Sequence, residues 1–198
     1  MVRSIVLASS SPYRRQLLER LELPFLTEVP DVDETAQPGE AHAQTALRLA
    51  LVKARACAPR HPQALIIGAD QVAELDGQPI GKPGSREAAR GQLRAMCGRS
   101  VVFHSALALL DAASGRHSVQ SVPTTVLFRP LSDQAIEDYL QREAAYDCAG
   151  SAKIEALGIC LVQSVHSQDP TALIGLPLIA LTTLLGEFGV ALPLPAAP

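Results

Sequence analysis

The chain has 198 residues, of which 47% are apolar and 19% charged, and it carries a net charge of −3. This length and apolar content suit one α/β domain, or two lobes that share a core, and they exclude global disorder. The acidic excess argues against a wide surface for nucleic-acid backbones, but it leaves room for a small cationic site for one phosphorylated ligand.

The cysteines and the apolar runs bear on where the protein works. Cys57, Cys97, Cys148 and Cys160 form no CxxC pair, which favours free, buried thiols in a reducing compartment. No apolar run reaches the roughly 20 residues that span a bilayer, and the start lacks the pattern of a signal peptide. We therefore expect a cytoplasmic protein that associates neither with membranes nor with nucleic acids.

Strands and helices alternate in the first part of the chain. A serine-rich turn separates the first strand from a helix whose first turn holds Pro12, a position where the missing N–H costs nothing. Asp70 follows the second strand and is expected at its C-terminal end. The expected order is a strand at 4–8, a helix from Pro12, a loop at 28–39, a helix at about 40–58 and a strand at 65–69.

The rest of the chain predicts a hairpin and three further helices. The expected order is a turn at 76–77, a loop at 81–84, a helix at 85–97, strands at 100–110 and 119–128 joined by a hairpin at 111–116, a helix capped by Ser132, a strand at 158–165 and a helix opened by Pro177. The alternation of strands and helices, together with a central hairpin, favours a mixed sheet flanked by helices. We expect one domain over residues 1–198, with 190–198 as a flexible tail.

The serine-rich turn is the first candidate site. Hydroxyl groups of Ser9 and Ser10 and free N–H groups at a helix N-terminus form an anion site that the helix dipole strengthens. Arg14 adds a planar donor fork that suits phosphate oxygens. The alternative is an ordinary serine cap beside solvated arginines.

Two acidic stretches are the next candidates. Asp70, with Gln71 beside it, stands at the strand edge where α/β folds place ligands, and it can hold a divalent cation or accept a proton from water. The segment 31–35, which includes Glu34, offers clustered carboxylates for a hard cation. The alternatives are a turn aspartate and a solvated acidic loop.

Two lysines and a glycine-containing segment complete the candidates. Lys53 lies on a helix rich in alanine and leucine, and Lys82 lies in a stiffened loop, so each can neutralise a phosphate as a point charge. Glycines in 149–158 allow close backbone approach, and Glu155 can accept hydrogen bonds from a base edge. The alternatives are surface lysines and a polar loop.

Taken in order, these segments resemble the Maf family of nucleotide pyrophosphatases. Any one motif is weak, but seven in register are hard to reach by chance, and together they cover nearly the whole chain. The matching stretches are Ala8-Ser9-Ser10-Ser11-Pro12 with Arg14, Asp33-Glu34-Thr35, Lys53-Ala54, Gly68-Ala69-Asp70, Gly81-Lys82-Pro83, Ala149-Gly150-Ser151 and Gly175-Leu176-Pro177.

The resemblance implies an elongated α/β fold with a mixed central sheet and a deep cleft between two lobes. It implies hydrolysis between the α and β phosphates of a nucleoside triphosphate, a divalent cation (Mg²⁺ or Mn²⁺), and a homodimer. By the same resemblance, Asp70 is the proton acceptor, and Glu34 and Asp70 position the metal or the water. The implied phosphate contacts are Ser9, Ser10, Arg14, Lys53 and Lys82.

Three positions separate branches of the family. The dTTP/UTP branch typically has arginine where this chain has Tyr13, threonine where Gln71 stands and glutamine where Glu155 stands. The chain departs at all three positions and is similar to the branch that acts on 7-methyl-GTP. Methylation at N7 leaves guanine cationic, so we hypothesise that Tyr13 stacks on the base and Glu155 pairs with its N–H edge.

Two other functions remain open on the sequence. One is a housecleaning pyrophosphatase for another modified or non-standard nucleotide, including a dTTP- or UTP-like one, because such an enzyme would share the phosphate machinery. The other is a nucleotide-binding regulator of cell division without turnover, which would not need Asp70, Lys53, Lys82 and Glu34 together. A Walker-type NTPase is excluded, since no GxxxxGK[ST] stretch occurs.

Overall fold

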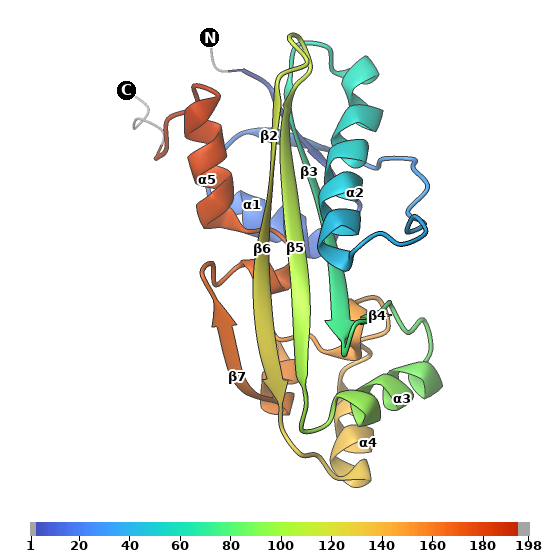
Figure 1. Cartoon of the computed structure of the whole chain (residues 1–198). Coiled ribbons are helices and arrows are strands. Elements are labelled where there is room, and N and C mark those ends of the chain that lie inside the picture. The colour runs from blue at the N-terminus through green and yellow to red at the C-terminus, as the bar shows by residue number, and fades with distance from the viewer. Residues whose placement is uncertain (1–2, 194–198) are drawn as a thin grey trace. The chain divides into compact units, whose positions relative to one another are not determined.

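The computed structural model describes residues 3–193 and shows a mixed α/β fold (Figure 1). The strands are β1 (Ile5–Ala8), β2 (Phe25–Glu28), β3 (Leu65–Leu75), β4 (Gln78–Ile80), β5 (Ser100–Asp111), β6 (His117–Phe128) and β7 (Val162–Ser167). The helices are α1 (Pro12–Glu19), α2 (His42–Cys57), α3 (Arg86–Met96), α4 (Asp133–Arg142) and α5 (Leu178–Glu187). Short 3-10 helices lie at Ala58–Arg60, Ala149–Ser151, Leu157–Leu161 and Ala172–Ile174.

The strands of the described residues form one seven-stranded sheet in the order β2-β1-β3-β5-β6-β7, with β4 paired to β3. β1 runs parallel to β2 and β3, whereas the β3–β4 and β6–β7 pairs are antiparallel. The predicted mixed sheet flanked by helices is confirmed. Over the described part of the chain, no helix is both long and apolar enough to cross a membrane.

The chain divides into two compact units. The first unit comprises the residues up to Gln71, Ser105–Val122 and the residues from Asp169 onward, and the second comprises Val72–His104 and Pro123–Gln168. β3, β5 and β6 contribute residues to both units. The prediction of one chain-long domain stays a prediction. Of the predicted tail, Val190 is buried in the core of the first unit, and residues 194–198 lie outside the described residues.

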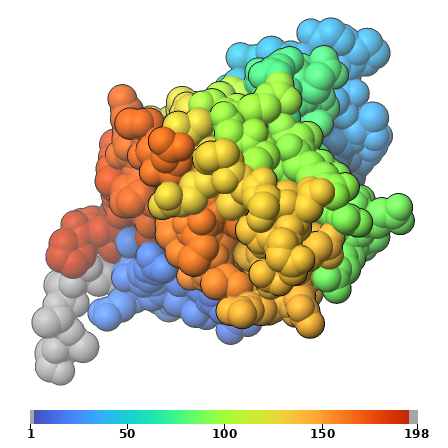
Figure 2. Space-filling model, turned by 90° about the horizontal axis from the view of Figure 1, so that it is seen from below, coloured from blue at the N-terminus to red at the C-terminus, as the bar shows by residue number. Residues whose placement is uncertain are grey.

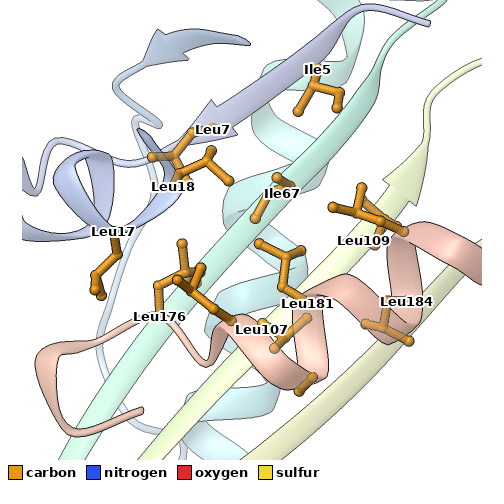
Figure 3. Packing of buried hydrophobic residues seen from close by; sticks show 14 of the residues in the cluster. Ile5, Leu7, Leu17, Leu18, Ile67, Leu107, Leu109, Leu176, Leu181 and Leu184 are labelled. Carbon is orange, nitrogen blue, oxygen red and sulfur yellow. The ribbon is translucent and has the colours of Figure 1, made fainter. Parts of the chain in front are cut away.

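The core of the first unit lies on both faces of β1 and β3. Successive side chains of a strand point to opposite faces, so Ile5 and Leu7 pack toward α1 and α5, whereas Val6 and Ala8 pack toward α2. Leucines of α1 and α5 meet those of β5 on the first face (Figure 3). Each such leucine, removed from water, stabilises the fold by about 1.5–3 kcal/mol. Burial on both faces explains why β1 is a continuous apolar run rather than an alternating one.

Helix α2 packs directly on the backbone of β3 at Gly68. A Cβ atom at Gly68 would lie 2.0 Å from the carbonyl oxygen of Ala50 and 3.0 Å from the backbone nitrogen of Ala54. The absence of a side chain at Gly68, together with the small alanines of α2, permits this close approach. As a result, Lys53 of α2 reaches Asp70 of β3.

The second unit contains α3 and α4, which pack together and adjoin on the face seen in Figure 2, α3 in green and α4 in gold. Both helices begin with the predicted serine caps. The Ser85 hydroxyl accepts the Ala88 N–H at 3.2 Å, and the Ser132 hydroxyl accepts the Ala135 N–H at 3.2 Å. The buried side chains of these helices are Ala89, Leu93, Met96, Ile136, Tyr139 and Leu140.

Several sequence expectations need correction. The strands β2 and β4 were not predicted, because both are short and largely solvent-exposed and so lack an apolar run. β3 does not end at Ala69 but continues to Leu75, because it pairs with β4 beyond the point where β1 stops. Asp70 is therefore an interior strand residue. The cysteines are free as predicted, but only Cys57 of the four is buried, whereas Cys97 and Cys148 are half-buried and Cys160 is exposed.

The late strand was expected over 158–165, but β7 begins only at Val162. The preceding residues form a 3-10 helix, in which the Ile159 N–H donates to the carbonyl oxygen of Ala156 at 3.3 Å. A Cβ atom at Gly158 would lie 2.5 Å from the Lys153 carbonyl oxygen, so the chain folds back tightly on itself here. This local turn outcompetes strand pairing.

Candidate active site

The serine-rich turn joins the end of β1 to the first turn of α1. The Ser11 hydroxyl caps the helix by accepting the Arg14 N–H at 3.3 Å, and Pro12 occupies the first turn as predicted. The Ser9 hydroxyl accepts the Ser11 N–H at 3.1 Å. Ser9 is buried, whereas Ser10 is exposed, so the two predicted phosphate contacts differ in their access to solvent.

The Arg14 guanidinium is held by two backbone carbonyl groups. Its Nε donates to the carbonyl oxygen of Gly175 at 2.9 Å, and its Nη1 donates to that of Ala69 at 2.9 Å. Burial lowers the pKa of Arg14, while the charges of Asp70 and Glu34 act in the opposite direction. A poorly hydrated guanidinium of this kind favours a bound anion.

Gly175 lies directly beside the Arg14 side chain. Its φ of +119° is unfavourable for other residues, and a Cβ atom there would lie 3.4 Å from Arg14 Nε. The segment is held in place by Asp169, whose carboxylate accepts the N–H groups of Thr171 at 2.9 Å and of Ile179, in the first turn of α5, at 2.7 Å. Sequence reasoning missed Asp169, because it does not occupy a helix N-cap position and its partner in α5, the Ile179 N–H, lies ten residues along the chain.

A buried lysine joins two carboxylates at the centre of the site. Lys53 Nζ lies 2.6 Å from an Asp70 carboxylate oxygen and 2.8 Å from a Glu34 carboxylate oxygen. Lys53 and Asp70 are only 5% and 6% exposed, whereas the Glu34 side chain is 59% exposed. Lys53 is therefore not a surface lysine. The ammonium group places one interior carboxylate and one solvent-facing carboxylate side by side.

The two carboxylates fit a divalent cation whose remaining coordination positions are filled by water and substrate. Among the described residues, no group of three or more His, Cys, Asp or Glu side chains could form a metal cage. Mg²⁺, however, commonly takes one or two carboxylates and fills its remaining positions with water and phosphate oxygens. Glu34 and Asp70 both contact the Lys53 ammonium group, and their carboxylates supply such a pair.

Gln71 lies next to Asp70 and holds the segment that leads to Gly175. Its amide nitrogen donates to the Ser105 hydroxyl at 2.7 Å and to the carbonyl oxygen of Leu173 at 3.0 Å. Ser105, which sequence reasoning also missed, is a fully buried serine within an apolar strand. That polar interruption was the available signal. The predicted contact of Gln71 with substrate stays a prediction.

The remaining predicted site residues are Tyr13, Lys82 and Glu155. Tyr13 is half-buried on α1 in the first unit. Lys82 is exposed in the loop after β4, and Glu155 is exposed before the 3-10 helix that starts at Leu157, both in the second unit. Their roles stay predictions. The first unit alone brings together Arg14, Lys53, Asp70 and Glu34.

The cationic side chains of Arg14 and Lys53 and the carboxylates of Asp70 and Glu34 lie near the turn between β1 and α1. This arrangement suits chemistry on a phosphate anhydride. The fold is that of an α/β protein, and the site is a candidate for binding a phosphorylated ligand. The chain belongs to the family of Maf-like proteins, whose family model matches residues 4–188. The family predicted from the sequence motifs is thereby confirmed.

Curated relatives match along almost the whole chain. A 7-methyl-GTP pyrophosphatase from Bordetella pertussis is 58% identical and covers 94% of this chain and 92% of its own length. A 7-methyl-GTP pyrophosphatase from Ralstonia nicotianae is 59% identical, and the match covers 91% of this chain and 93% of that protein. A solved structure of the Staphylococcus aureus Ham1 protein aligns with a TM-score of 0.47 at 19% identity, covering 65% of this chain and 73% of that one. That structural similarity is too distant to bear on function.

Proposed function

We propose that this chain is a nucleoside-triphosphate pyrophosphatase that hydrolyses the α–β phosphate bond of 7-methyl-GTP, giving 7-methyl-GMP and pyrophosphate. The observation that carries the proposal is the Lys53 ammonium, held between Asp70 and Glu34 next to the Arg14 guanidinium. The substrate is supported by relatives of 58% and 59% identity that are named 7-methyl-GTP pyrophosphatases.

The residues of the first unit divide the chemical work. Arg14 and the N-terminus of α1 bind phosphate oxygens and counter their charge before water attacks. Asp70 orients the attacking water and accepts its proton, and Lys53 holds the Asp70 carboxylate in one orientation. Phosphoryl-type transfer depends mostly on such positioning and charge stabilisation.

The metal forms part of this proposal. Glu34 and Asp70 would hold a Mg²⁺ or Mn²⁺ ion. When bound, the cation neutralises charge on the phosphate oxygens. The phosphate contact that the family resemblance implies for Lys82 stays a prediction. A cytoplasmic location, a housecleaning role and a homodimer likewise stay predictions.

A panel of nucleoside triphosphates tests the proposed function. The purified chain is assayed with 7-methyl-GTP, GTP, UTP and dTTP, with and without Mg²⁺ or Mn²⁺, and pyrophosphate and phosphate are measured separately. We expect pyrophosphate as the product, the highest kcat/KM for 7-methyl-GTP, and loss of turnover when the metal is chelated. Binding of nucleotides without turnover in the presence of metal would instead support a regulator.

The base preference should depend on Glu155. A glutamate can pair with the N–H edge of a cationic 7-methylguanine as an ionised acceptor, whereas a glutamine offers only a neutral amide. For Glu155→Gln we expect kcat/KM for 7-methyl-GTP to fall by about 10- to 100-fold, because hydrogen bonds to charged groups contribute about 1.5–3 kcal/mol. The kcat/KM for UTP should change little. An unchanged ratio between the two substrates would contradict the proposed role of Glu155.

A further inference from the structure

The loop that carries Glu34 has no regular secondary structure, yet its backbone is anchored at the next residue. The Asp33 carboxylate accepts the Thr35 N–H at 2.9 Å, which forms a local turn around Glu34. The carbonyl oxygen of Thr35 accepts a hydrogen bond from Arg48 Nη2 at 3.1 Å. The exposed Glu34 side chain therefore projects from a backbone segment that is held at the next residue, Thr35, through both its N–H group and its carbonyl oxygen.

Arg48 is itself held by a two-pronged ion pair. Its Nε lies 2.7 Å from one Glu40 carboxylate oxygen, and its Nη2 lies 2.8 Å from the other. Glu40 also accepts the Thr45 hydroxyl at 3.0 Å and the Gln37 N–H at 3.1 Å. Hydrogen bonds from Arg48 lower the pKa of Glu40 to about 2, so the pair stays charged above the ordinary pKa of 4.5 and weakens only as the pH falls toward 2.

One helix thus holds two consecutive loop residues with two different cations. Lys53 of α2 binds the Glu34 side chain at 2.8 Å, and Arg48 of the same helix binds the Thr35 backbone at 3.1 Å. The planar guanidinium fork restricts orientation in a way that a single ammonium contact does not. Lys53 alone would leave an exposed side chain on an unanchored loop free to adopt other rotamers.

We propose that Arg48, braced by Glu40, is a positioning residue for the reaction, because it fixes the loop at Thr35 so that Glu34 stays beside Lys53 and Asp70. This inference rests on the proposed function, in which Glu34 takes part in metal or water positioning. Arg48 contacts neither substrate nor reacting atoms in this scheme. Its whole effect passes through Glu34.

A double-mutant cycle between Arg48→Gln and Glu34→Gln tests this route. A displacement of about 1 Å at a reacting group costs up to about 100-fold in rate, so Arg48→Gln should lower kcat by about 10- to 100-fold with little change in KM. In the Glu34→Gln background, the same Arg48→Gln change should alter kcat by less than about 3-fold. Multiplicative losses in the double variant would overturn the inference, because they would show that Arg48 acts independently of Glu34.

Two further variants separate positioning from charge and folding. Arg48→Lys keeps the positive charge but loses the fork, and we expect it to lose nearly as much kcat as Arg48→Gln. Arg55→Gln, at an exposed position of the same helix, is the matched control and should keep the wild-type kcat. Full activity of Arg48→Lys would show that charge alone suffices and would overturn the positioning role.

Amide hydrogen exchange gives a readout that does not depend on turnover. In Arg48→Gln, peptides that cover residues 33–40 should exchange at least about 10-fold faster, while peptides from β3 and β5 keep their protection. Unchanged exchange in 33–40 would overturn the anchoring. If the wild-type chain hydrolysed no triphosphate, the proposed function and the positioning role of Arg48 in the reaction would fail, whereas hydrogen exchange would still decide separately whether Arg48 anchors the loop.

Discussion

Asp70→Asn should lower kcat for 7-methyl-GTP by about 10²- to 10⁴-fold, which is the usual contribution of a positioned general base. Asparagine keeps the size of the side chain and can still accept a hydrogen bond from Lys53, but it cannot take a proton from water. KM should change less than kcat, because Arg14 and α1 still bind phosphate. Steady-state kinetics in the presence of Mg²⁺ or Mn²⁺, with pyrophosphate as the measured product, checks this.

The stability of the Asp70→Asn variant must be followed alongside its activity. Removal of one partner from a buried ion pair can cost about 3–5 kcal/mol, but here Lys53 keeps Glu34 as a second partner, which limits the loss. Thermal unfolding should therefore show a folded protein at the assay temperature. Asp133→Asn, which removes a largely exposed carboxylate paired with Arg94, is the matched control and should leave kcat unchanged. Retention of more than a tenth of kcat by Asp70→Asn would contradict the role of Asp70 as the base.

Gly68→Ala should be strongly destabilising and should also abolish most activity. The new methyl group would lie 2.0 Å from the carbonyl oxygen of Ala50, and a helix backbone cannot move aside as a flexible side chain can. We expect a loss of about 3 kcal/mol or more and a Tm lowered by about 6–12 °C. Because any relief of the clash pushes α2 away from β3, Lys53 should also separate from Asp70.

Gly91→Ala provides the control for Gly68→Ala. Gly91 lies within α3, and a Cβ atom there would meet nothing within 4 Å, so alanine should stabilise the protein by about 0.5–1 kcal/mol. Calorimetry of both variants, together with kcat measured at a temperature below both Tm values, checks the two predictions. If Gly68→Ala kept the wild-type Tm and kcat, the close packing of α2 on β3 could not be what brings Lys53 to Asp70.

Several elements could be predicted because their causes are local. Ser11, Ser85 and Ser132 cap helices through hydrogen bonds to residues three positions along, and Pro12 fits a first turn wherever it occurs. The turn at Asp76-Gly77 also follows from residues that tolerate positive φ. The short edge strand β2 could not be predicted, because its pairing with β1 depends on a neighbour that is distant in sequence.

The sequence motifs and their order along the chain likewise predicted which residues belong to the site, but they did not predict the contacts between those residues. Lys53 could be a surface lysine on sequence grounds, and only the packing of α2 on Gly68 buries it against Asp70. Ser105 and Asp169 escaped notice because each binds a backbone group of a separate segment, the Ala172 carbonyl oxygen and the Ile179 N–H respectively. Such contacts leave no spacing pattern in the chain.

The amino-acid sequence by itself determined the mixed α/β class, the helix caps and the membership of the Maf-like family, since these depend on local propensity and on motifs in register. Tertiary structure alone decided that Glu34 and Asp70 share Lys53, that Gly175 holds Arg14, and that Arg48 anchors the Glu34 loop. The physical reason is that each of these contacts joins segments far apart in the chain. Their formation depends on how closely helix and strand backbones approach.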